Sequence, residues 1–194
     1  QGRKGQGIMS VSERKGEKKA GGEMTNRAMA LSTFIPFQKI RHSTDKKQNK
    51  ILMKADLQEH EWVATEKIHG CNFSFYCSGD TVRCARRRGL LKEGEKFVLG
   101  YEKVVKTTSP LVKKLYHILN KKHPIERCIV YGELFGGAYN HPDVNHNTNV
   151  KRVQKGVFYS PDLHFLAFDV LVSDKKASRF LDFDEMSQVL QQAK

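Results

Sequence analysis

Short apolar runs, in which hydrophobic positions alternate with polar ones or follow one another directly, recur along the chain after residue 33. Such runs are typical of β-strands, and the two longest are apolar enough to lie in the middle of a sheet. Ser78-Gly79-Asp80 has the residues of a tight turn and lies between two of the runs, which predicts a hairpin. The pattern predicts strands at Trp62–Thr65, Asn72–Cys77, Thr81–Arg86, Arg127–Phe135 and Leu163–Val172.

Two other stretches have the spacing of amphipathic helices. In the first, Ser109 and Pro110 have the residue types of an N-cap and a first helical residue, and apolar residues recur at helical spacing from Leu111 to Leu119. In the second, Asp182 and Glu185 form a capping box before another apolar helical face. The order of elements is neither a regular βαβ alternation nor all-β. We therefore predict an α+β domain of mostly antiparallel sheets flanked by helices.

The first part of the chain has a different composition. Residues 1–33 are Gly-rich and charged and hold no sustained apolar periodicity, so we predict a flexible basic leader there. Phe34 and Ile35 open the predicted folded domain, which runs over residues 34–194, and the polar segment Arg41–Lys50 predicts a loop within it. The chain begins with Gln rather than Met, and we expect it to be a fragment.

Charge narrows the class of partner. Among 194 residues, 34 Lys and Arg stand against 21 Asp and Glu, which gives a net charge of +13. A surplus of this size attracts polyanions such as nucleic acids, nucleotides or anionic lipids, although basic charge alone also serves solubility. No apolar run approaches the length of a membrane span, so we expect no membrane partner. Four cysteines without CxxC spacing suggest a reducing, intracellular setting, and they leave the compartment open.

The segment with the most chemistry is Glu66–Phe73, which places a lysine, Lys67, just before a glycine at the start of a predicted strand. A lysine that acts as a nucleophile must lose its proton, which requires partial burial or neighbouring positive charge. Gly70 would let a phosphate approach the backbone, and His69 and Asn72 offer hydrogen-bond donors to it. An exposed surface lysine is the ordinary alternative.

Lys67-Ile68-His69-Gly70 resembles the KxDG-type nucleotidyl-transfer motif in a KxHG form, and several other blocks resemble the RNA ligase 2 family, especially its RNA-editing ligase branch. The string Tyr131–Gly137, YGELFGG, is the most specific of them, and the blocks occur in the family's order. The other blocks are Ala85–Gly89, Tyr139–Val144 and Phe165–Asp169.

The resemblance implies a nucleotidyltransferase (ATP-grasp-like) domain in an ATP-dependent RNA ligase. Such an enzyme joins the 5′-phosphate and 3′-hydroxyl ends of RNA through a lysyl-AMP intermediate, with Mg²⁺, in RNA repair or editing. It implies that Lys67 attacks ATP, that Phe168 stacks on adenine beside Asp169, and that Glu133 and Arg87 contact the ribose. It further implies a phosphate- and Mg²⁺-orienting role for His69 and Asn72, a backbone contact of Glu66 with adenine, and a place for Ile68 among the nucleotide-binding residues.

The family's two late motifs have no counterpart here. The Glu-Gly of the fourth motif appears only as Glu93-Gly94, before the third, and the paired lysines of the fifth are absent. We therefore expect a C-terminally truncated domain that adenylylates itself poorly. Two alternatives stay open: a catalytically incomplete RNA-binding remnant, and a nucleotidyltransferase of the DNA ligase or capping type. His141, Asp143 and His146 share a loop, but a polar surface is the better interpretation, and we predict no metal site of protein ligands there.

Overall fold

The computed structural model describes residues 31–40, 44–54 and 61–194. All but the last three residues of the predicted leader lie outside the described residues. Leu31, which the sequence assigned to that leader, is buried and belongs to the same apolar cluster as Tyr76 and Tyr131. Packing therefore reaches to Leu31, just before the predicted boundary at residue 34.

The described residues form one six-stranded sheet in which every neighbouring pair is antiparallel. The strand order is β3-β2-β1-β4-β5-β6, so the two long predicted strands, β4 and β5, lie inside the sheet as expected. The predicted α+β class with antiparallel pairing is confirmed. The strands are β1 (Cys71–Ser78), β2 (Thr81–Arg86), β3 (Gly89–Leu90), β4 (Arg127–Ala138), β5 (Ser160–Ser173) and β6 (Ser178–Phe180).

One predicted strand, Trp62–Thr65, is wrong. Residues 61–69 run without a ladder partner, and Trp62 and Val63 are exposed to 68% and 55%. A strand needs a neighbour for its backbone hydrogen bonds, and both edges of the nearby β1 are already taken by β2 and β4. The segment therefore has the residue composition of a strand but no neighbouring strand to pair with.

The helices differ from prediction at their starts. α3 (Tyr101–Lys122) begins well before Ser109, so Ser109 is not its N-cap, and Pro110 lies inside it. Proline removes one backbone hydrogen bond, but burial of Tyr101 and Val104 stabilises the preceding turns. Residues 46–50 of the predicted loop belong to α2 (Lys46–Lys54).

The prediction for the second helix is confirmed in α4 (Phe183–Ala193). The side chain of Asp182 accepts a hydrogen bond from Glu185 N at 2.7 Å, as an N-cap does. The Glu185 carboxylate does not complete the box, because it pairs with both terminal nitrogens of Arg179. Neither α4 nor any other helix in the described part of the chain has the length and apolar character needed to cross a bilayer.

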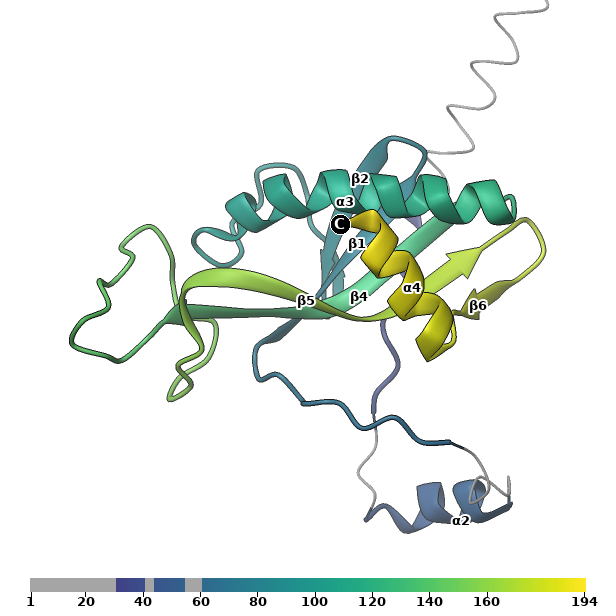
Figure 1. Cartoon of the computed structure of the whole chain (residues 1–194), viewed down its shortest axis with the longest axis horizontal. Coiled ribbons are helices and arrows are strands. Elements are labelled where there is room, and N and C mark those ends of the chain that lie inside the picture. Colours follow the sequence, from purple (N-terminus) through teal and green to yellow (C-terminus); the bar gives the residue numbers. More distant parts are fainter. Residues whose placement is uncertain (1–30, 41–43, 55–60) are drawn as a thin grey trace, which may run out of the picture.

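The sheet has two differently covered faces. α3 and α4 pack on one of them (Figure 1), which we call the helix face, and bury Phe73, Phe75 and Val130. Residues 34–40 cross the other, the pocket face, and we call them the strap. Tyr76 Oη and Tyr131 Oη both donate to the carbonyl oxygen of Ile35, at 2.7 and 2.8 Å, and so fix the strap to the sheet.

Candidate functional site

A pocket of about 680 Å³ opens on the pocket face. Four parts of the chain form its wall: the strap, the segment that leads into β1, the β2–β3 turn, and the facing side chains of β1, β4 and β5. Eight of the nine residues that the sequence nominated lie on this wall. They are Glu66, Lys67, Ile68, Asn72, Arg87, Glu133, Phe168 and Asp169.

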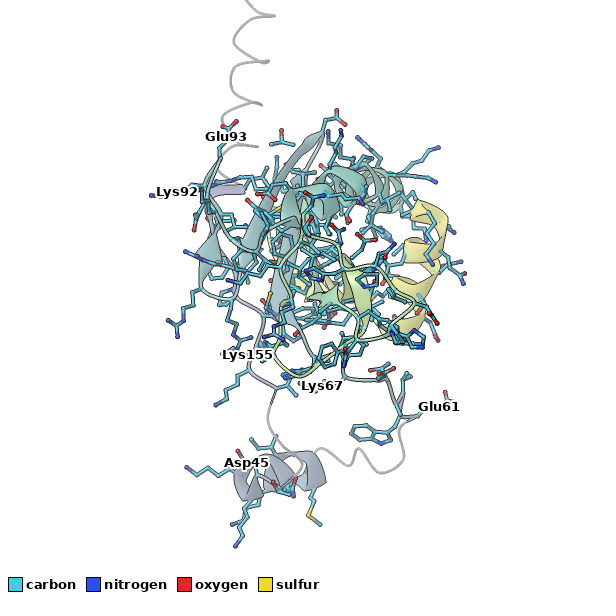
Figure 2. The ribbon with its side chains drawn as sticks, turned by 90° about the vertical axis from the view of Figure 1, so that its left-hand side faces the viewer. Asp45, Glu61, Lys67, Lys92, Glu93 and Lys155 are labelled. Atoms are coloured by element: carbon cyan, nitrogen blue, oxygen red, sulfur yellow. The ribbon has the colours of Figure 1, made fainter. Side chains whose placement is uncertain are left out.

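The turn that carries Lys67 is fixed by its own backbone. Gly70 N donates to Glu133 Oε1 at 3.1 Å, and Gly70 O accepts from Gln154 Nε2 at 2.6 Å. A Cβ at position 70 would collide with the carbonyl oxygen of Leu134, so only glycine allows this approach to β4. The motif glycine therefore holds Lys67 against the strand that carries Glu133, at the lower edge of the core in Figure 2.

Glu133 is the half-buried carboxylate of the site. Burial raises its pKa above the ordinary value of glutamate, and the hydrogen bond from Gly70 N and the nearby charges of Lys67, His69 and Arg87 oppose that rise. Asp169 lies on the same wall, and burial raises the pKa of its carboxyl group too. The pocket thus holds two acidic groups whose ionised forms favour a cationic or hydrogen-bond-donating partner.

A β-bulge turns Phe168 into the pocket. β5 pairs with β4 so that Asp169 lies opposite Tyr131 and Ala167 opposite Gly132, which leaves Phe168 as the extra residue. The bulge changes which residues of β5 point to the helix face. Odd-numbered Phe165 lies before it and even-numbered Val170 after it, yet both join the helix-face core. Leu166, Phe168 and Asp169 can consequently all line one pocket, which a regular strand would not permit.

The strap supplies pocket residues that sequence reasoning missed. Phe37 packs edge-on against Phe168, with ring centroids 4.8 Å apart, and also contacts Tyr131. The motif pattern holds no signal for this segment, whose apolar residues predicted only the start of the folded domain. The missed wall residues are Phe37, Gln38, Lys39, Ile40, Thr65 and Leu166.

His69 is the one nominated residue that is not on the wall. Its backbone N donates to Tyr159 Oη at 3.1 Å, which ties the Lys67 turn to the loop between β4 and β5. In that loop His141 Nδ1 lies 3.8 Å from Asp143 Oδ2. Within the described ranges, no three His, Cys, Asp or Glu residues gather in a way that would hold a metal ion.

The three arginines at positions 86–88 line two different hollows. Arg87 and Asn72 line both the main pocket and a second hollow of about 400 Å³, which Arg86 and Arg88 also line. Arg86 forms an ion pair with Glu95 at 2.9 Å. Positive charge therefore continues from the main pocket along the β2–β3 turn.

Comparison with known proteins gives a consistent result. A family model described as RNA ligase matches residues 60–194. The mitochondrial RNA-editing ligase 2 of Trypanosoma brucei brucei is 32% identical over 178 residues, which cover 82% of this chain and 42% of that protein. The mitochondrial RNA-editing ligase 1 of the same organism is 34% identical over 179 residues, 79% of this chain and 38% of that protein. The chain thus spans about two fifths of the length of these curated relatives.

Solved structures share the fold. A variant Naegleria gruberi RNA ligase with AMP and Mn superposes with a TM-score of 0.51 at 14% identity, over 81% of this chain and 40% of that one. A variant of an RNA ligase from the same organism, in its apo form, gives a TM-score of 0.50 at 16% identity, with the same coverage of both chains.

Proposed function

We propose, from the premise that this chain belongs to the RNA ligase family, that it is the lysine-bearing part of an ATP-dependent RNA ligase. The ligase would join a 5′-phosphate to a 3′-hydroxyl in RNA repair or editing, through a lysyl-AMP at Lys67. The observation that carries the proposal is the single pocket that brings Lys67 together with Glu133, Arg87 and Phe168.

The volume and lining of the pocket support ATP as the substrate. A pocket of about 680 Å³ is in the range of small-ligand sites. Phe168, which is 37% exposed, presents an aromatic ring for adenine, and Glu133 and Arg87 are suited to ribose hydroxyls. Glu66 and Ile68 line the same space.

In the proposed first step, Lys67 Nζ attacks the α-phosphorus. A P–N bond forms as the bond to the pyrophosphate oxygen breaks, and pyrophosphate leaves. AMP then passes to the RNA 5′-phosphate and frees Lys67. Attack by the 3′-hydroxyl on that activated phosphate completes the RNA bond and releases AMP.

Mg²⁺ fits this wall only as a hydrated ion held mainly by the substrate phosphates. The carboxylates of Glu133 and Asp169 lie on this wall, but among the described residues no three ligand side chains gather into a cage. When bound, the ion would neutralise charge on the triphosphate. Asn72, which lines the pocket, would orient that hydrated group, whereas His69 does not line the pocket and would act only from beside it.

Incubation of the longest form of the protein that contains this chain with α-labelled ATP and Mg²⁺ tests the proposal. We expect alkali-stable, acid-labile and hydroxylamine-sensitive label, as a P–N bond gives, on the wild type and none on Lys67→Ala. Lys114→Ala is the matched control, because Lys114 is an exposed lysine on α3. It should keep the label.

Absence of label from the wild type would overturn the proposal. Persistence of RNA binding in that case would leave the RNA-binding remnant as the better account. Label that survives Lys67→Ala would move the nucleophile to another residue.

A further inference from the structure

We propose that the loop between β4 and β5 forms a second site on this protein, one that binds an unpaired RNA nucleotide. The inference rests on the proposed RNA ligase function and deepens it. The loop covers residues 139–159 and lies at the left-hand end of β4 and β5 in Figure 1. This end faces the viewer in Figure 2. We call it the 139–159 loop.

The loop encloses a hollow of about 460 Å³ whose lining combines aromatic rings with basic groups. Tyr139 and Phe158 are 45% and 43% exposed, although rings of this size gain by burial. Lys151 and Arg152 are exposed on the same wall. Stacking surfaces beside cationic groups are what a splayed nucleotide requires, because every base has a π face and every linkage carries a negative charge.

Charge in the loop is one-sided. Between residues 139 and 159 Asp143 is the single acidic residue, against Lys151, Arg152 and Lys155. A surface that docks a protein helix would more often present a continuous apolar face without such a surplus. The composition therefore favours a polyanion over a protein partner.

The hollow is built into the fold rather than carried on a loose flap. Val150, in the middle of the loop, is buried in the helix-face core, and Lys151 N donates to Leu99 O at 3.1 Å. Gly137, at φ +84°, lies so close to the Lys151 carbonyl that a side chain there would collide with it. Val153 N donates to Gly136 O at 3.1 Å. These contacts fix the two walls of the hollow relative to each other.

The same loop is bonded to the turn that carries Lys67. Gln154 Nε2 donates to Gly70 O, and Tyr159 Oη accepts from His69 N. Lys155, the next residue after Gln154, lies with Lys67 at the lower edge of the core in Figure 2. An RNA strand bound in the hollow would thus be bound by a loop that is hydrogen-bonded to the turn beside the nucleotide pocket. This arrangement suits RNA whose end must reach that pocket.

Fluorescence anisotropy with labelled single-stranded RNA of about ten nucleotides tests the site. The double variant Tyr139→Leu/Phe158→Leu removes both rings but keeps apolar bulk. We expect it to bind at least about tenfold more weakly. Tyr139→Phe keeps the ring and should bind within about twofold of the wild type.

A charge test separates the hollow from general attraction. Lys151→Gln/Arg152→Gln should weaken RNA binding and flatten its salt dependence. Lys106→Gln/Lys114→Gln removes the same charge from the exposed side of α3 and should leave binding largely unchanged. Label transfer from ATP to Lys67 is measured in parallel for every variant and should persist.

Three results would overturn the inference. They are wild-type-like binding by the leucine double variant, an equal loss in the α3 control, and no RNA binding by the wild type. In each case the label on Lys67 shows independently whether the proposed nucleotidyl transfer stands.

Discussion

The two faces of the sheet carry side chains of the same strands but serve different ends. On the helix face, α3 and α4 close over Phe73, Phe75 and their neighbours and bury them. On the pocket face, the strap crosses part of the sheet, and Glu133 and Phe168 remain partly open. Successive residues of β1 and β4 point to opposite faces of the sheet. Residues on one face therefore build the core, and residues on the other line the pocket.

The largest expected difference between the faces is in the effect of losing a ring. Phe75 is fully buried, with its ring centroid 4.9 Å from that of Phe165, so Phe75→Ala should lower the free energy of unfolding by about 3–5 kcal/mol. Phe168→Ala should cost about 1 kcal/mol, because its ring is already partly exposed, yet it should greatly weaken ATP binding. Urea denaturation and ATP binding measure the two effects. Equal losses of stability would refute the division between faces.

The next largest effect concerns the glycine that joins the Lys67 turn to β4. Gly70→Ala should cost about 1–3 kcal/mol and suppress label formation at Lys67, because the new methyl group would displace the turn from Leu134. Gly89→Ala is the control: a Cβ there meets nothing within 4 Å. Thermal unfolding and α-labelled ATP report both. If Gly70→Ala labels as well as Gly89→Ala, the close approach is not needed to position Lys67.

The smallest effect is electrostatic and depends on pH. Because burial raises the pKa of Glu133 in the fold, its contribution to stability is full below the ordinary pKa of about 4.3 and is lost as the pH rises through the raised value. Glu133→Gln should therefore raise Tm relative to the wild type more at pH 7 than at pH 4. The exposed Glu126→Gln is the control and should show no such difference. A Tm difference for Glu133→Gln that does not change with pH would refute this sign.

Much of the strand content followed from local pattern. β1, β2 and their turn, the cores of β4 and β5, and the cap of α4 were all predicted, because each depends on neighbours within a few residues. The failures have non-local causes. Trp62–Thr65 lacks a partner strand, and α3 continues through Pro110 because Tyr101 and Val104 are buried against the sheet.

The site shows the same division. Motif spacing nominated Lys67, Glu133 and Phe168, and their assembly on one wall agrees with that nomination, while their chemical roles stay predictions. Spacing held no sign of Phe37 on the wall or of the link from His69 to Tyr159. These contacts join residues that are remote in sequence.

The sequence by itself determined the α+β class, the principal strands and the family, because periodicity, turn residues and motif strings are local properties of the chain. Only the tertiary structure decided which side chains share the pocket. Three features arise from contacts between segments that are remote in sequence. They are the bulge at Phe168, the strap over the sheet and the attachment of the 139–159 loop to Gly70. The close packing of these segments against one another fixes their positions, so the arrangement cannot be read from any one segment alone.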